Sequence, residues 1–205
     1  MNTKSAEDLY QLPTYAKLPL TITKGKGAYV WDQNGRKYLD FYGGHAVALI
    51  GHCHPKLISA IKKQLNKLIF YSNVVYNSQR ALAAKSLIDL TKGKFASVFF
   101  CNSGTEANET ALKLAKKFTQ KDEIISFIGS FHGRTIGSLS ITGFEKYHKD
   151  VGSLMPNVKF AQLGNIESVK KLITDNTAAV ILEPIQSIAG ISEAGSDFYN
   201  HLKQL

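Results

Sequence analysis

Residues 98–117 read VFFCNSGTEANETALKLAKK, and this stretch decides the expected fold. Residues 98–100 form a short apolar run bounded by turn formers, which predicts a buried strand. Apolar residues then recur at helical spacing, and Ser103 with Glu106 three residues later is the pattern of a helix N-cap with a capping box. The sequence therefore predicts a strand that turns directly into a helix, whose first turn is residues 104–106.

The first turn of this helix has the properties of an anion site. Its backbone amides have no acceptor within the helix, and the helix dipole adds partial positive charge, so a phosphate group is the natural ligand. Gly104 lets a ligand come close to the backbone, and the Thr105 hydroxyl supplies another donor. An ordinary capped helix without a ligand is the alternative, and the turn taken alone favours that alternative.

Length and composition indicate a globular protein. The 205 residues can bury a full core, and 44% of them are hydrophobic. No apolar run reaches the roughly 20 residues of a membrane span, the start of the chain lacks the apolar segment of a signal peptide, and Cys53 and Cys101 suit reduced thiols. These features point to the cytoplasm. The formal charge of +9 comes from lysines scattered over helix faces, so we do not expect nucleic acid as a partner.

The first part of the chain predicts a small antiparallel unit. Residues 1–19 are expected to be irregular, because Pro13 and Pro19 prevent one long helix. Three runs then alternate apolar and polar side chains, and Asn34 followed by Gly35 marks a tight hairpin turn. The three predicted strands are residues 20–23, 28–31 and 37–41.

The rest of the chain alternates helices and strands, which predicts a mainly parallel sheet with flanking helices, an α/β fold. We divide the chain into residues 1–54, which hold the N-terminal segment and the antiparallel unit, and residues 55–205, an α/β domain. The further strands expected in this domain are 124–128, 158–161 and 178–182, and the further helices are 55–68, 78–91, 166–174 and one with Ser196 as its N-cap.

The strand predicted at residues 124–128 is followed by the loop FHGRT at 131–135. Ligands of open α/β sheets gather outside the carboxyl ends of the strands, so this loop and the turn at 104–106 are expected to meet at one crevice. Phe131 could stack on a flat ring, and Arg134 could hold a carboxylate with its two-pronged guanidinium. Core packing for Phe131 and a surface ion pair for Arg134 are the alternatives.

Other polar groups stand in mainly apolar surroundings. Glu183 ends an apolar strand, where a carboxylate is costly unless a positive or hydrogen-bonding group meets it, so a structural salt bridge and a functional role are both open. Residues 71–73, Tyr-Ser-Asn, form a polar loop between two helices, and such loops often carry function. His52, Cys53 and His54 are adjacent and have no second ligand pair at usable spacing, so no metal site is expected.

Three motifs in this order, NSGTEANE at 102–109, FHGRT at 131–135 and EPIQ at 183–186, make the chain resemble the class III aminotransferases, which use pyridoxal phosphate. The likeness is greatest to the acetylornithine aminotransferases, helped by GAYVWDQNGRKYLDFYGGHAVALIGHCHP at 27–55 and FYSN at 70–73. The resemblance implies the pyridoxal-phosphate-dependent transferase fold type I and a homodimer. It implies transfer of an amino group from N-acetylornithine to 2-oxoglutarate in arginine biosynthesis, with ornithine, succinylornithine or 4-aminobutyrate as alternative donors.

The resemblance also assigns roles to individual residues. Gly104 and Thr105 would bind the cofactor phosphate, and Phe131 would stack on the pyridine ring. Arg134 would clamp the substrate carboxylate, and Glu183 would sit among the arginines that alternate between donor and keto-acid binding. The implied cofactor residues are Ser103, Gly104, Thr105, Phe131 and His132, and the implied substrate residues are Arg134, Glu183, Ser72 and Asn73.

The chain departs from the family pattern at two places. The family usually continues EPIQ with Gly-Glu-Gly, whereas Ser187, Ile188 and Ala189 follow here. The aspartate that pairs with the pyridinium nitrogen and the lysine that forms the Schiff base come in the family after the helix at Ser196, so we expect an N-terminal half that turns over little by itself. A non-catalytic partner subunit that keeps the phosphate site and a phosphate-binding regulatory domain are the alternatives from other classes.

Overall fold

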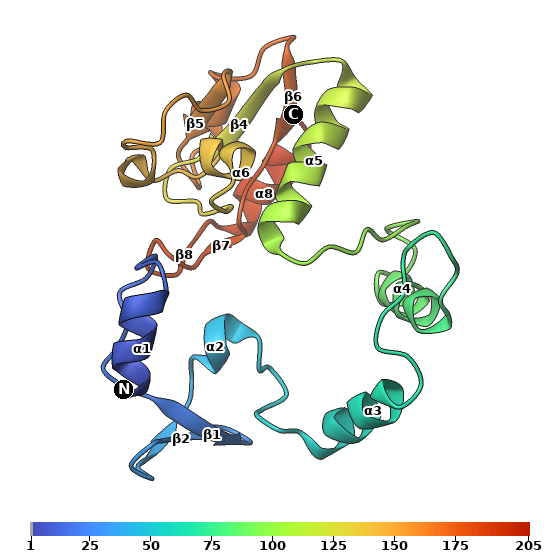
Figure 1. Ribbon diagram of the computed structural model, residues 1–205. Coiled ribbons are helices and arrows are strands. Elements are labelled where there is room, and N and C mark those ends of the chain that lie inside the picture. The colour runs from blue at the N-terminus through green and yellow to red at the C-terminus, as the bar shows by residue number, and fades with distance from the viewer. Residues whose placement is uncertain (1) are drawn as a thin grey trace. The chain divides into compact units, whose positions relative to one another are not determined.

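The computed structural model describes residues 2–205 and divides the chain into two units, Met1–Ala81 and Leu82–Leu205 (Figure 1). The boundary expected between residues 54 and 55 falls inside the first unit and stays a prediction. No helix in the described part of the chain is long and apolar enough to cross a membrane.

The first unit contains the expected three-stranded antiparallel sheet, although its first strand begins and ends later than the predicted residues 20–23. β1 (Ile22–Lys26), β2 (Tyr29–Asp32) and β3 (Lys37–Leu39) pair in the order β1-β2-β3. Asp32 closes the turn after β2, because its carbonyl accepts the Gly35 amide at 3.0 Å and its carboxylate accepts the Asn34 amide at 2.9 Å. The turn therefore lies at the Asn-Gly pair, as the sequence predicts.

The expectation that residues 1–19 are irregular is wrong for their first half. α1 (Thr3–Tyr10) begins after Asn2, whose side chain accepts the Ser5 amide at 2.8 Å. Lys4 pairs with Asp8 one turn later at 2.6 Å. Both prolines lie beyond the end of the helix, so they limit its length without preventing it.

The chain makes a left-handed turn after β3. All four residues of α2 (Gly43–Ala46) have positive φ angles, from +55° to +61°. Asp40 holds the start of the turn, since its carboxylate accepts the Tyr42 and Gly43 amides at 2.9 Å each and pairs with His52 at 2.6 Å. Glycine suits the first two positions, where no side chain opposes this backbone conformation.

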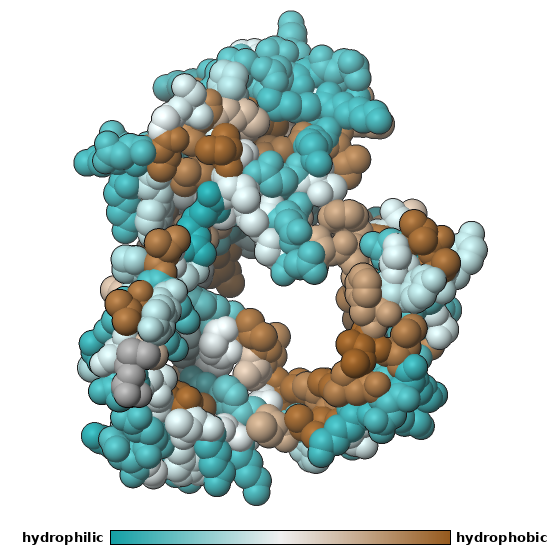
Figure 2. All heavy atoms as spheres, viewed as in Figure 1, coloured by the Kyte–Doolittle hydropathy of each residue, from teal (hydrophilic) through white to brown (hydrophobic). Residues whose placement is uncertain are grey.

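The helix expected at residues 55–68 is α3 (Pro55–Leu65), with proline in its first turn. Its apolar side chains are well exposed, and Leu57, Ile61 and Leu65 have exposed fractions of 46%, 46% and 50%. Figure 2 shows brown, apolar atoms along one side of this helix and teal atoms along the other. The helix is therefore amphipathic, but its apolar face, which the helical spacing predicts to be buried, is exposed in the described part of the chain.

A parallel sheet forms the centre of the second unit, as the sequence predicts. β4 (Glu123–Phe127) is the middle strand, with β5 (Val158–Ala161) and β6 (Thr177–Val180) on its two sides. Alternate residues of β4 pack on opposite faces. Ile125 and Phe127 join a cluster with Val169 and Phe198, whereas Ile124 joins a cluster with Leu112.

Helices therefore cover both faces of this sheet. α5 (Gly104–Thr119), which contributes Leu112, covers one face, and α7 (Ile166–Lys170) and α8 (Ser196–Leu202) cover the other. Figure 1 shows α5 running along the strands. The remaining elements are α4 (Ser78–Leu90), α6 (Ile136–Ser140), the 3-10 helix η1 (Glu145–Tyr147) and a short antiparallel pair, β7 (Ile185–Gln186) and β8 (Ser192–Glu193).

Two local expectations in this unit are wrong. Residues 98–100 form no strand and pair with none of the described strands, and the side chains of Phe99 and Phe100 are 62% and 45% exposed. An apolar run becomes a strand only when a neighbour takes up its backbone hydrogen bonds. The N-cap of α8 is Gly195, one residue before the expected Ser196, and no side chain caps that helix.

Candidate functional site

The start of α5 is built as the sequence predicts. Ser103 is the N-cap, and its hydroxyl oxygen accepts the Glu106 amide at 3.2 Å. The Glu106 carboxylate returns to the Asn102 amide at 2.8 Å and to the Ser103 hydroxyl at 3.0 Å, so the reciprocal bond goes to the residue before the cap. The Ser103 hydroxyl, followed by the Asn102 groups, holds the pKa of the Glu106 carboxyl below its usual value. This end of the helix is well ordered by its own side chains.

The amides of Gly104 and Thr105 are left for a ligand. Within residues 2–205 neither amide has a hydrogen-bond partner, and a Cβ placed on Gly104 would meet no atom within 4 Å. The space before the helix is therefore open. Two unsatisfied N–H groups at a helix start, together with the helix dipole, fit a phosphate group.

The loop after β4 packs against this helix start. The hydroxyl oxygens of Thr105 and Thr135 lie 2.8 Å apart, and the Asn108 side-chain amide donates to the His132 carbonyl at 2.6 Å. Gly133 makes the approach possible, because a Cβ at this position would lie 2.7 Å from the Thr105 Cβ. The structure thus brings together the turn at 104–106 and the loop after β4, the two segments that the sequence predicts to meet.

Glu109 joins the same loop to α5 and was missed in the sequence. Its carboxylate accepts the Thr135 hydroxyl and, at 3.0 Å, the Ser138 amide in the first turn of α6. Gly137 leaves room for it, since a Cβ there would lie 2.9 Å from the carboxyl carbon. The available signal was its spacing of four residues from Thr105, which places both side chains on one face of the helix.

Phe131 is held at its backbone and at its ring. The Glu183 carboxylate accepts the Phe131 amide at 2.7 Å, across 52 positions of sequence. The Tyr147 ring meets the Phe131 ring edge-on, with centroids 5.9 Å apart and an angle of 71° between the planes. The Glu183 carboxylate, which lies three residues after the end of β6, therefore meets an N–H donor, and this contact offsets the cost of removing it from water. Tyr147 was not singled out in the sequence, because nothing local links it to Phe131.

His132 is buried in the packing of this loop, with 7% of its surface exposed. Its amide donates to the Thr142 hydroxyl at 3.0 Å, and its ring nitrogen Nε2 has no hydrogen-bond partner among the described residues. Burial lowers the pKa of the His132 imidazole to about 4, so the ring is neutral at physiological pH.

The remaining expected residues are Arg134 in the second unit and Ser72 and Asn73 in the first unit. Arg134 is exposed on the loop after Phe131. Ser72 and Asn73 belong to the first unit, where the Asn73 side-chain oxygen accepts an Arg80 guanidinium N–H at 2.7 Å. The structure describes both residues within that unit.

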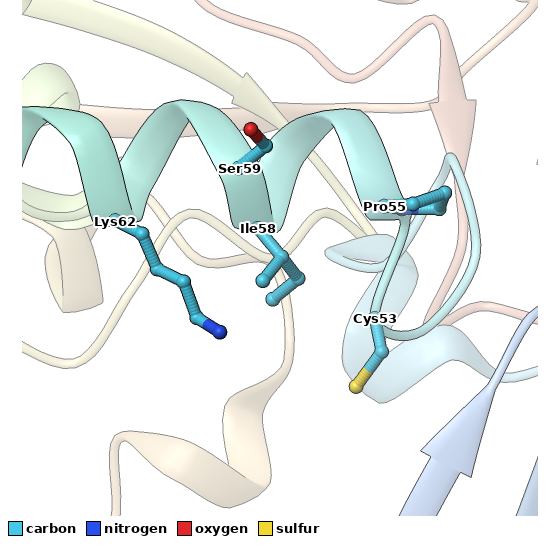
Figure 3. A pocket seen from close by; sticks show the side chains of 5 residues that line it. All are labelled: Cys53, Pro55, Ile58, Ser59 and Lys62. Atoms are coloured by element: carbon cyan, nitrogen blue, oxygen red, sulfur yellow. The ribbon is translucent and has the colours of Figure 1, made fainter.

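A groove of about 610 Å³ lies at the start of α3 in the first unit (Figure 3). Figure 3 shows Cys53, Ile58 and Lys62 on one side of the helix and Ser59 pointing away from them. None of the expected site residues lines this groove. In the described part of the chain no group of three or more histidine, cysteine, aspartate or glutamate side chains could hold a metal ion.

Comparison with known proteins places this arrangement in a family. The model of the family "Aminotransferase class-III" matches residues 10–205. The acetylornithine aminotransferase of Methanopyrus kandleri is 42% identical over 205 residues, covering 100% of this chain and 53% of that protein. The acetylornithine aminotransferase of Aquifex aeolicus is 44% identical over 203 residues, covering 96% of this chain and 53% of that protein. The chain thus spans about half the length of the curated relatives it matches.

Solved structures agree with the sequence relatives. An ornithine aminotransferase of Toxoplasma gondii, crystallised in the presence of oxidized glutathione with partial occupancy of PLP at its active site, matches with a TM-score of 0.91 and 28% identity. The match covers 98% of this chain and 49% of that chain. The taurine:2-oxoglutarate aminotransferase of Bifidobacterium kashiwanohense shares the fold, with a TM-score of 0.90, 24% identity and coverage of 98% and 51%. On the family match over residues 10–205, the chain belongs to the class-III aminotransferases.

Proposed function

We propose that this chain carries the cofactor-binding part of a pyridoxal-phosphate-dependent aminotransferase that moves an amino group from N-acetylornithine to 2-oxoglutarate in arginine biosynthesis. The observation that carries the proposal is the pair of unsatisfied amides at the start of α5, joined through Thr105 and Thr135 to the loop that bears Phe131. The choice of donor is supported by curated relatives that are acetylornithine aminotransferases at 42% to 44% identity.

Different residues of the second unit would bind different parts of the cofactor. The amides of Gly104 and Thr105 would bind the phosphate, and Ser103 would keep them pointing outward by capping the helix. Phe131 would lie against the pyridine ring. The buried, neutral His132 would hold the loop in place through its packing and its backbone bond to Thr142. When bound, pyridoxal phosphate supplies an electron sink for negative charge that develops next to the substrate amine.

The substrate side of the site is proposed from the family resemblance. Arg134 would bind the substrate carboxylate in a bidentate contact, which its exposed place on the loop allows. Glu183, Ser72 and Asn73 are assigned to the substrate side by the same resemblance. We further propose that the complete protein acts in the cytoplasm as a homodimer on small amino and 2-oxo acids, and the support for these points is the family membership.

A pair of glycine substitutions tests the phosphate site. Gly104→Val would place a branched side chain over the two amides, and Gly195→Val is the matched control, because Gly195 also lies at a helix start with nothing within 4 Å of its Cβ position. Isothermal titration with pyridoxal phosphate should show weakened binding for Gly104→Val alone. Equal affinity in both variants and the unaltered chain would remove the start of α5 from the site.

A further inference from the structure

In the turn at residues 129–132, which contains Phe131, each backbone amide donates a hydrogen bond. The Gly129 and Ser130 amides donate to the carbonyls of Gly143 and Phe127, at 2.9 and 3.1 Å. The His132 amide donates to the Thr142 hydroxyl at 3.0 Å. These partners are carbonyl and hydroxyl groups. The Phe131 amide alone in this turn donates to a carboxylate, that of Glu183.

The segment that contains Glu183, residues 183–186, makes a second hydrogen bond to the backbone just before the turn. Gln186 is 3% exposed, and its side-chain amide donates to the Ile128 carbonyl at 3.0 Å. Gly129 accommodates this contact, because a Cβ there would lie 2.9 Å from the Gln186 side-chain oxygen. Residues 183–186 therefore fix both the end of β4 and the backbone of Phe131, and loss of Glu183 would leave the Gln186 contact in place.

The ring of Phe131 is attached to the backbone that Glu183 holds. This ring meets the Tyr147 ring edge-on, with centroids 5.9 Å apart. Tyr147 is itself fixed by a second edge-on contact with Phe144, with centroids 5.8 Å apart. If the Phe131 amide lost its acceptor, we expect the peptide between Ser130 and Phe131 to rotate and the ring to leave its place against Tyr147.

We propose that Glu183 is also a positioning residue, which sets the ring of Phe131 through the hydrogen bond to the Phe131 amide and so acts on the cofactor, in addition to the substrate-side role proposed above. This inference rests on the proposed function, in which Phe131 lies against the pyridine ring. It gives Glu183 a role that is complete before any substrate binds. A residue that contacts only substrate would leave the affinity for the cofactor unaltered.

Two substitutions at one position separate the hydrogen bond from the charge. Glu183→Gln keeps an oxygen acceptor at the same reach, so pyridoxal phosphate should bind with nearly unaltered affinity. Glu183→Leu removes the acceptor, and affinity should fall by about tenfold, because the released Phe131 ring must be ordered again when the cofactor binds. In a Phe131→Leu background, Glu183→Leu should have no further effect on affinity, because its effect passes through the ring.

A measurement without ligand tests whether the hydrogen bond from the Phe131 amide to Glu183 sets the position of the Phe131 ring. Hydrogen exchange of the Phe131 amide, followed by NMR on the full chain, should be slow in the unaltered protein and in Glu183→Gln, and fast in Glu183→Leu. The ring-current shift that Tyr147 imposes on the Phe131 ring protons should disappear only in Glu183→Leu.

The outcomes are distinct. Unchanged exchange and ring shifts in Glu183→Leu would overturn the proposal, as would altered exchange with unaltered cofactor affinity, or equal losses in affinity for Glu183→Gln and Glu183→Leu. Failure of the unaltered chain to bind pyridoxal phosphate, or insensitivity of binding to Gly104→Val, would instead count against the proposed function.

Discussion

The buried imidazole of His132 makes the stability of the second unit depend on pH. Burial lowers its pKa from 6.5 to about 4 in the folded state. Between these values the unfolded chain binds a proton that the folded chain does not, so stability falls as pH decreases. The difference between these two pKa values corresponds to about 3 kcal/mol of stability at most, lost progressively as the pH falls from about 6.5 to about 4.

Urea unfolding at a series of pH values measures this effect. As the pH falls through this window, the free energy of unfolding of the unaltered chain should decrease. The part due to His132 has a limiting slope of about 1.4 kcal/mol per pH unit. His132→Gln cannot titrate, so its stability should be lower at neutral pH, where packing is lost, but less sensitive to pH across this window. Identical pH dependence in both proteins would refute the argument that the folded state keeps His132 neutral.

Three further substitutions test neighbouring parts of the account. Arg134→Lys in the complete protein should raise the KM for dicarboxylate or amino-acid substrates by the equivalent of about 1.5 to 3 kcal/mol while leaving pyridoxal phosphate binding nearly intact, and steady-state kinetics with each substrate would show it. Gly133→Ala should weaken cofactor binding in a titration, because the new Cβ would press on Thr105 at 2.7 Å and the φ of +137° disfavours a side chain. Phe127→Ala should lower the free energy of unfolding by about 3 to 5 kcal/mol in urea, since Phe127 on β4 is 0% exposed and packs against Phe198 of α8; a loss below about 1 kcal/mol would contradict that packing.

The parts of the fold that could be predicted from sequence are those with local signals. The cap at Ser103 and the start of α5 follow from residues within one turn of each other. β4 is readable as a run of apolar residues, and the hairpin at Gly35 as an Asn-Gly pair. α1 also had a local signal, the side chain of Asn2, and the two prolines beyond the helix masked it.

The other features depend on contacts between distant residues. Residues 98–100 have the pattern of a strand but no strand to pair with in the described chain. The link from Glu109 to Thr135 joins positions 26 apart, and the bond from Phe131 to Glu183 joins positions 52 apart. Sequence could propose Phe131 and Glu183 as site residues, but only the fold shows that one holds the backbone of the other.

The central claim is that the start of α5 and the loop after β4 together bind pyridoxal phosphate, and a crystal structure of this chain with the cofactor tests it most directly. We predict phosphate density within hydrogen-bond reach of the Gly104 and Thr105 amides and the pyridine ring against Phe131. Density for the cofactor in the groove at the start of α3, or anywhere away from these residues, would contradict the account.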